Sequence, residues 1–404
     1  MLSINSTAGV AGILALTYIG GATAEEPAPN SASIAGLVFE DLNGNAMRDD
    51  KEPGIAGIRV SDQVSVVSTG EDGSFLLPGD GGYGFVYVSQ PAGYRVGGPF
   101  WRRIPVKGEV VEFPLTRTEQ LVNFTFIHAS DPHLSLETLD RMRLLREIVD
   151  EQQPAFVLIT GDLIKDALRV GEEEATGLYE LFVQELAKFP VPVWTTLGNH
   201  EIFGIERHHS LVSPDHPLYG KQMYRHYLGP NYYSFDFGGI RFISLDTVDY
   251  DDLWYNGYVD EVQMAWLREE LSSLAPETPV VTFNHIPLLS AGENVYGFHK
   301  GGPAPSLITV DGETRYRHTV SNTREVLTEL RQHRYDLALS GHLHMREKLL
   351  FETHGVKTRF FMTSAVRDDS LDRSGLDMIS GVVLYRVSNG EIDDGTFIPL
   401  DPTP

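Results

Sequence analysis

The chain has 404 residues, of which 32 are Lys or Arg and 56 are Asp or Glu, so its formal net charge is −24. A surface this negative repels polyanions, and we therefore expect no nucleic-acid partner. The chain contains no cysteine, which excludes disulfides, thiolate metal ligands and a lipid-attached cysteine. Its length allows one large domain and a smaller one.

The first 24 residues carry no charge. Residues 10–19 are mostly apolar, and Ala22-Thr23-Ala24 is a run of small residues before Glu25. This pattern is typical of a secretory signal peptide over residues 1–24, cleaved after Ala24, although it lacks the usual positive charge at its start. The apolar run is short for a spanning helix, so we expect no permanent membrane anchor. We expect an exported protein that is periplasmic, extracellular or on the cell surface.

Residues 25–33 form a linker rich in Pro, Ala and Ser, and residues 34–118 are dense in Gly and β-branched residues. Alternating runs at 58–60, 64–67 and 85–88 indicate short strands. The pattern predicts a small N-terminal all-β sandwich domain over residues 34–118.

Within this domain, five polar residues have the spacing of an EF-hand-like calcium loop. They occupy positions 1, 3, 5, 9 and 12 of such a loop: Asp41, Asn43, Asn45, Asp49 and Glu52. Met47 offers a carbonyl at position 7, whereas position 6 is Ala46 in place of glycine. We expect a structural calcium ion here, with a solvated turn as the alternative.

Five short polar motifs lie in order in the remaining residues, 119–404, which we expect to form the larger domain. Four of them directly follow an apolar run, and all five runs are typical of buried strands: residues 124–129, 155–160, 192–197, 280–283 and 336–340. The motifs combine carboxylate, amide and imidazole groups, which borderline divalent metals prefer. They are Asp131-Pro132-His133, Gly161-Asp162, Gly198-Asn199-His200-Glu201, Asn284-His285 and Gly341-His342-Leu343-His344.

The spacing of the motifs predicts parallel strands, because the intervals from Asp131 to Asp162 and from Asp162 to Asn199 each leave room for a helical crossover. The first interval also has an amphipathic helical pattern, with one apolar face formed by Leu139, Met142, Leu145, Ile148 and Val149. Side chains at the carboxyl ends of parallel strands converge in one crevice. The sequence therefore predicts a two-metal hydrolase.

At these motifs the chain resembles the calcineurin-like metallophosphoesterases, from about Leu121 to about Met345. The segments 232–238 and 242–246 look like a hairpin of that family, and Gln263, Trp266 and Leu267 look like a shared helix. Segments 69–75 and 91–94 resemble the N-terminal domain of certain bacterial members. The resemblance implies an α/β (α+β) four-layer αββα sandwich, with two mixed sheets facing each other and helices outside. We expect the runs at 358–362 and 382–386 to complete the second sheet.

The resemblance also implies a role for each motif residue. Asp131, His133 and His344 would bind a first metal; Asn199, His285 and His342 would bind a second; and Asp162 would bridge the two. A metal-bridging hydroxide would attack phosphorus. His200 would assist the leaving group, and Glu201 would orient His200.

The metals implied are two divalent transition ions, and manganese, iron and zinc remain open because these ligand types do not separate them. Purple acid phosphatases have a tyrosine ligand for ferric iron three residues after the bridging aspartate, but this chain has Lys165 there. The difference argues against a ferric-tyrosinate centre.

The substrate implied is a small organic phosphate ester. Residues 293–318 look least like the family, and we expect them to form a loop over the metals with Arg315 and Arg317 as substrate contacts. His208 and His209 are candidates for the opposite wall. The leading hypothesis is an exported phosphatase or phosphodiesterase, and the alternative is a cell-surface binding or scaffold protein with a vestigial metal site. The sequence does not separate monoester from diester substrates or define the oligomeric state.

Overall fold

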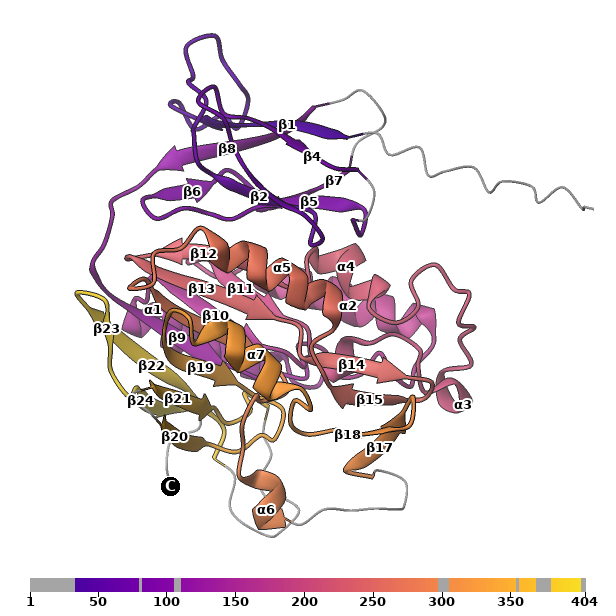
Figure 1. Ribbon diagram of the computed structural model, residues 1–404. Helices are drawn as coiled ribbons and strands as arrows, with labels where there is room; N and C mark the ends of the chain where they lie inside the picture. The colour runs from indigo at the N-terminus through magenta and orange to yellow at the C-terminus, as the bar shows by residue number, and fades with distance from the viewer. Residues whose placement is uncertain are drawn as a thin grey trace, which may run out of the picture.

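The computed structural model describes residues 33–79, 82–104, 110–296, 305–353, 356–367 and 379–400 (Figure 1). The smaller, N-terminal domain has two four-stranded sheets, ordered β4-β1-β8-β6 and β3-β2-β5-β7, which confirms the predicted all-β sandwich. Its strands are β1 (Ile34–Glu40), β2 (Arg59–Ser61), β3 (Val66–Ser68), β4 (Ser74–Leu77), β5 (Phe85–Val88), β6 (Tyr94–Val96), β7 (Trp101–Arg103) and β8 (Val111–Arg117).

The larger domain begins with a sheet of order β11-β10-β9-β22-β23, in which β24 also pairs with β22. Its strands are β9 (Asn123–Ala129), β10 (Phe156–Thr160), β11 (Val193–Thr196), β22 (Gly381–Ser388), β23 (Glu391–Ile392) and β24 (Thr396–Pro399). Strands β9, β10 and β11 are parallel, as predicted, and α1 (Leu139–Gln152) and α2 (Glu172–Leu186) connect them.

The second sheet has the order β12-β13-β16-β19-β21-β20. Its strands are β12 (Tyr233–Phe237), β13 (Ile240–Leu245), β16 (Pro279–Asn284), β19 (Arg334–Ser340), β20 (Glu347–Thr353) and β21 (Val356–Met362). The four inner strands are parallel, and the edge strands β12 and β20 are antiparallel to their neighbours. Helix α5 (Glu261–Ser272) connects β13 to β16, and α7 (Thr323–Leu330) connects β16 to β19. Two mixed sheets with helices outside confirm the predicted four-layer fold (Figure 1).

Helix α1 shows how the sequence pattern builds these layers. Met142, Leu145 and Val149 recur at helical spacing, and all three are fully buried in the core of the larger domain. Burying a side chain of this size stabilises the fold by about 1.5–3 kcal/mol. The helix ends where Gln153 takes a left-handed backbone conformation (φ 49°), which turns the chain toward β10.

One strand lies in the other sheet from the one expected. Residues 382–386 belong to β22, which pairs antiparallel with β9 in the first sheet, whereas residues 358–362 lie in β21 of the second sheet as predicted. In the second sheet β21 already has β19 and β20 as neighbours, while β9 has an edge that only β22 covers. An apolar run indicates a buried strand but carries no information about which sheet edge it joins.

The remaining elements are short and lie mostly beyond the carboxyl ends of the strands (Figure 1). They include two hairpins, β14 (Val248–Asp251) with β15 (Trp254–Gly257) and β17 (Leu307–Val310) with β18 (Glu313–Tyr316). The second hairpin shows that residues 293–318, expected as a loop, contain regular structure. The others are η1 (Asn199–Glu201), α3 (Arg207–Ser210), α4 (Gln222–Leu228) and α6 (Gly292–Tyr296).

The smaller domain lies against β12 and α5 of the larger one (Figure 1). Just before β12, Tyr232 and Gln63 exchange two hydrogen bonds of 2.6 Å between side chain and backbone. At α5, the Trp266 indole donates to the Tyr87 hydroxyl (2.9 Å), and both side chains are fully buried. Arg59 pairs with Glu270 of the same helix at 3.1 Å. Because Tyr87 is part of the larger domain's apolar core, this interface resembles a protein interior.

The predicted signal peptide, its cleavage site after Ala24 and residues 25–32 lie outside the described residues. Within the part of the chain that the structure describes, no helix has the length and apolar character needed to cross a membrane.

Candidate metal centre

The polar side chains of the five motifs meet at one end of the two facing sheets. Each follows the carboxyl end of a strand, as expected for parallel strands. Their donor atoms form two groups, within each of which all lie within 4.8 Å of one another: Asp131, His133, Asp162 and His344 in one group, and Asp162, His285 and His342 in the other. Asp162 belongs to both groups, so it lies at the centre of the cluster.

The first group brings β9, β10 and β19 together. The Nε2 atoms of His133 and His344 are 3.1 Å apart, and His344 Nε2 lies 3.3 Å from Asp131 Oδ1. His133 Nε2 also lies 3.6 Å from Asp162 Oδ2. These four side chains therefore direct their donor atoms toward one point.

The second group brings β10, β16 and β19 together, and Asn199, which follows β11, lies beside it. His285 Nε2 lies 3.0 Å from Asn199 Oδ1 and 3.2 Å from Asp162 Oδ1. His342 Nδ1 lies 3.2 Å from the same Nε2 atom of His285. Asp162 thus directs Oδ1 toward the second group and Oδ2 toward the first, which is the geometry required of a bridging carboxylate.

The backbone that presents these side chains is strained. Non-glycine residues rarely adopt positive φ, and doing so costs about 1–3 kcal/mol each, a strain that clusters at functional sites. The segment that carries His342 also lies very close to the one that carries Asp131. A Cβ at Gly341 would be only 1.8 Å from Ser130 Oγ and 2.5 Å from Asp131 Oδ2. The site residues with positive φ are Asp131, His133, Asp162, His342 and His344.

Burial keeps two of the imidazoles neutral. It lowers the pKa of His133 well below its usual value, and the nearby His200 lowers it further. Burial and the neighbouring His285 lower the pKa of His342 in the same way. A neutral imidazole has a free lone pair, so both rings are in the protonation state that binds a metal.

Asp162 and His285 form an oppositely charged pair at the centre of the cluster. Burial opposes a charge on His285, but the adjacent Asp162 carboxylate raises the pKa of His285 to about 9. Burial also opposes a charge on Asp162, and the neighbouring His285 and His200 nevertheless hold its pKa well below the usual range. The Asp162 carboxylate is therefore ionised at neutral pH, the form in which it binds cations.

His200 lies at the edge of the cluster, and a backbone carbonyl on the side away from the cluster fixes the orientation of its ring. Its Nδ1 lies 2.7 Å from the Lys165 carbonyl oxygen, which accepts the Nδ1 proton, and its Nε2 is 3.9 Å from Asp162 Oδ2. Its backbone N–H donates to Asp162 Oδ1 (2.9 Å). The free Nε2 atom therefore faces the cluster. The backbone of Lys165, at the position where purple acid phosphatases have tyrosine, has this orienting role.

Glu201, the next residue after His200, is fully buried. Burial, with the negative charge of Asp162, raises the pKa of Glu201 to about 8. Its carboxyl oxygens accept the backbone N–H groups of Gly198 (2.7 Å) and Ile164 (3.1 Å). Glu201 thus joins the two loops that carry Asn199 and Asp162. The orienting of His200 by Glu201 stays a prediction.

The donor set fits two divalent cations. It comprises four imidazoles, two carboxylates and one amide oxygen, a mixture of nitrogen and hard oxygen ligands that suits manganese, iron or zinc. The Nε2 atoms of His133 and His344 are 3.1 Å apart. Because two nitrogen lone pairs repel each other, a proton or a cation must lie between these atoms, which supports this fit.

The two arginines predicted to contact substrate have protein partners. Arg315 pairs with Asp249 (2.8 Å) and lies over the Tyr258 ring, 3.8 Å from its centroid. Arg317 is 3% exposed, and its guanidinium donates to the carbonyl oxygens of Tyr255 (3.2 Å) and Pro305 (3.0 Å). These contacts hold the hairpin β17–β18 in place, and the substrate role of both residues stays a prediction.

His208 and His209 lie together on α3, with ring centroids 4.2 Å apart, and both are exposed. Their donor atoms lie within 4.8 Å of a Glu206 carboxyl oxygen, but Glu206 is already paired with Arg169 through two hydrogen bonds of 2.7 and 3.1 Å. The predicted role of the two histidines as a substrate wall stays a prediction.

The predicted calcium loop curls around its own carboxylates. Asp41 accepts the backbone N–H groups of Gly44 (2.7 Å) and Ala46 (2.9 Å), and Glu52 accepts that of Leu42 (2.8 Å). Ala46 has φ 60°, the conformation for which glycine is preferred at this position. Asn43 and Asn45 both donate to Asp49. The loop has the turn that the spacing predicted, and its calcium ion stays a prediction.

Two residues beside the cluster were not predicted as site residues. Arg367 follows β21, where its N–H donates to the Asp131 carbonyl (3.2 Å) and its positive charge adds to the burial that lowers the pKa of His133. His318 follows β18 and lies beside His342. Neither belongs to a motif, and only the density of cations and histidines in residues 293–318 gave a signal for His318.

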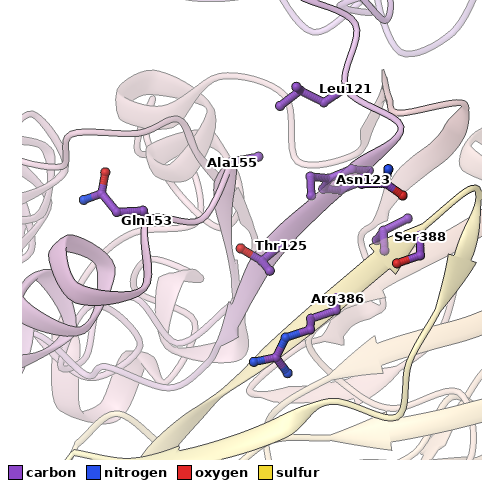
Figure 2. A pocket seen from close by; sticks show the side chains of 9 residues that line it. Leu121, Asn123, Thr125, Gln153, Ala155, Arg386 and Ser388 are labelled. Carbon is purple, nitrogen blue, oxygen red and sulfur yellow. The ribbon is translucent and has the colours of Figure 1, made fainter.

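A pocket of about 450 Å³ lies at the other end of β9, where this strand begins, beside the end of β22 (Figure 2). Arg386 is its one charged lining residue, and no carboxylate or imidazole lines it, so we assign it no catalytic role. Its lining residues are Leu121, Asn123, Phe124, Thr125, Gln153, Ala155, Arg386, Val387 and Ser388.

Comparison with known families places this centre in its context. The chain belongs to the calcineurin-like phosphoesterase family, whose model matches residues 124–346, more than half of the chain. A second model, described as the N terminal of calcineurin-like phosphoesterase, matches residues 41–118. The protein is therefore a metal-dependent phosphoester hydrolase that also has the N-terminal domain described by the second model.

Solved structures with a similar chain trace are distant in sequence. A dimetal phosphatase from Danio rerio is 15% identical with a TM-score of 0.45, covering 69% of this chain and 99% of that one. The purple acid phosphatase PPD1 from yellow lupin seeds is 14% identical with a TM-score of 0.42, covering 91% of this chain and 68% of that one. GAP50, the anchor in the inner membrane complex of Plasmodium, is 12% identical with a TM-score of 0.39, covering 69% and 85%. Comparison with curated proteins gave no match.

Proposed function

We propose that this protein is an exported hydrolase of small phosphomonoesters or phosphodiesters that works with two divalent transition metals. The observation that supports this proposal most directly is the position of Asp162, whose two carboxylate oxygens face two separate groups of ligands. Each group contains a further oxygen donor and two imidazoles, from Asp131, His133 and His344 on one side and from Asn199, His285 and His342 on the other.

When bound, two such cations would lower the pKa of a nearby water and neutralise charge on the phosphate oxygens. The protein contributes a rigid set of ligands. Burial keeps His133 and His342 neutral, and Asp162 is the ionised group at the centre. Asn199 supplies a neutral oxygen, which leaves its side of the cluster with less negative charge than a carboxylate would.

His200 is the group proposed to act on the leaving oxygen. With Nδ1–H held by the Lys165 carbonyl, Nε2 is the atom that can carry a second proton toward the cluster. As a water oxygen bonds to phosphorus, the bond from phosphorus to the ester oxygen breaks, and that proton passes from Nε2 to the departing oxygen. Glu201 supports this geometry by holding the loops beneath Asn199 and Asp162.

The test of this proposal is the hydrolysis rate of the manganese-loaded protein on a chromogenic phosphodiester and on the matching monoester. A preference for the diester indicates a phosphodiesterase, and a preference for the monoester indicates a phosphatase. If neither is turned over while two metals are bound, the proposed substrate class is wrong, and the scaffold alternative gains support.

We also propose that the loop from Asp41 to Glu52 binds calcium, which would pin the loop to the smaller domain. An ion present at a concentration about a hundredfold above its Kd stabilises the folded protein by about 2.7 kcal/mol. Calcium should therefore raise the midpoint of thermal unfolding of the wild type and of Asp50→Asn, which changes a neighbouring carboxylate outside the predicted ligand set. Calcium should leave the unfolding midpoint of Glu52→Gln unchanged. Equal shifts of the midpoint in all three proteins would contradict the proposal.

Export is the part of the proposal that rests on the sequence of residues 1–24. Expression in a bacterial host should yield a mature protein outside the cytoplasm that begins at Glu25. Intact-protein mass spectrometry of the periplasmic and cytoplasmic fractions measures this, and an uncleaved chain in the cytoplasm would argue against export.

A further inference from the structure

The hairpin β17–β18 is fixed next to the metal cluster by contacts with the hairpin β14–β15. The ion pair of Arg315 with Asp249 (2.8 Å) joins the two hairpins, and the buried Arg317 bonds to the Tyr255 carbonyl oxygen (3.2 Å). Just after β18, Val320 forms an isolated parallel bridge with Gly257 at the end of β15. The short segment between Arg317 and Val320 is therefore fixed at both of its ends by contacts with β15.

His318 lies within this held segment and contacts a ligand of the cluster. Its Nδ1 atom is 2.8 Å from Nε2 of His342, a short separation for a hydrogen bond between two rings. The two ring planes differ by only 28° and the ring centroids are 5.0 Å apart, so the rings meet edge to edge through these two nitrogen atoms. The Tyr255 ring meets the His342 ring edge-on, with centroids 5.8 Å apart.

The contacts of the ring nitrogens indicate which nitrogen of each ring carries a proton. His342 Nδ1 faces His285 and the second ligand group, so it is the atom with the lone pair for a metal. A neutral imidazole then carries its proton on Nε2, and this N–H donates to the lone pair on His318 Nδ1. His318 thus selects the tautomer of His342 that leaves Nδ1 free for coordination.

We propose that His318 is a positioning residue for the second metal and acts by fixing the ring and the tautomer of His342. The inference rests on the proposed two-metal function. Ligand histidines are usually held by a carboxylate, a backbone carbonyl or water. An imidazole in that place orients His342 without adding negative charge, and it links the metal site to the hairpin β17–β18.

Substitutions at His318 separate the hydrogen bond from the packing. His318→Phe keeps a ring but removes the acceptor, whereas His318→Asn places an amide oxygen near the position of Nδ1. We expect His318→Phe to bind one of two Mn²⁺ ions about 10–100-fold more weakly, the usual effect of losing such a partner, with the other ion unaffected. His318→Asn should recover most of this affinity.

The measurement is a titration of metal-free full-length protein with Mn²⁺ alone, followed by calorimetry and by electron paramagnetic resonance of the unbound ion. His226→Phe, at an exposed histidine on α4, is the matched control and should bind both ions as the wild type does. Unfolding of the metal-free variants shows whether the fold is intact. If the phenylalanine variant does not fold, His318→Leu provides the same comparison.

Unchanged affinity for both ions in His318→Phe would overturn the proposal, as would equal losses in His318→Phe and His318→Asn. The outcome is distinct from that of the proposed function. A wild-type protein that binds two Mn²⁺ ions but hydrolyses no phosphoester contradicts the function, while the comparison of affinities at His318 still decides the role of this residue.

Discussion

Asp162→Asn should abolish hydrolysis. The substitution keeps the size of the side chain but removes the charge that faces both ligand groups, with His285 Nε2 at 3.2 Å on one side and His133 Nε2 at 3.6 Å on the other. Paired metals contribute several kcal/mol to the stabilisation of a phosphoryl transition state, and 1.4 kcal/mol corresponds to a factor of ten. We therefore expect kcat/KM to fall by at least about 1,000-fold.

The loss should be accompanied by a loss of bound metal, which elemental analysis of the dialysed protein measures. Asp140→Asn, in the first turn of α1, changes an exposed carboxylate outside the cluster and should leave both activity and metal content unchanged. Full activity in Asp162→Asn would refute the two-metal assignment, because none of the other ligands takes part in both groups.

His200→Asn should reduce kcat by about 10²–10⁴-fold, the usual contribution of a positioned proton donor, while the metal content stays at the wild-type level. The metal content is preserved because His200 contacts Asp162 by its backbone N–H, which the substitution retains. Its imidazole contributes to the low pKa of Asp162, but His285 contributes more and remains in place.

The leaving group provides the sharper test of this role. A nitrophenolate ion departs without protonation, whereas an alkoxide requires a proton. The ratio of wild-type to His200→Asn rates should therefore be larger for an alkyl ester than for a nitrophenyl ester. An equal loss on both substrates would show that His200 stabilises the bound phosphate and does not protonate the leaving oxygen.

The sequence predicted the larger domain well because its apolar runs and its polar motifs give independent evidence for the same strand ends. Residues 124–129, 155–160 and 192–197 lie at β9, β10 and β11 within one or two residues, and the intervals between them contain α1 and α2. Convergence of Asp131, Asp162 and Asn199 then follows from parallel strand direction alone. The precise distances do not, because the left-handed backbone of Asp131 and Asp162 depends on tertiary contacts.

The sequence could not predict contacts that depend on distant partners. Arg315 and Arg317 were identified as cations near a metal site, but their partners Asp249 and Tyr255 lie about 60 residues away in another hairpin. His318 was one histidine among several in an irregular segment. The sequence also could not predict which sheet β22 joins, because this depends on its pairing with the distant strand β9.

The buried contacts of Tyr87 with Trp266 and of Gln63 with Tyr232 have a consequence for how the whole molecule moves. A domain attached only by a linker swings freely, whereas here a side chain of the smaller domain is packed into the core of the larger one. The β-sandwich therefore keeps a fixed position relative to the larger domain. Any molecule that this domain binds would stand at a constant distance and orientation from the catalytic end of the sheets.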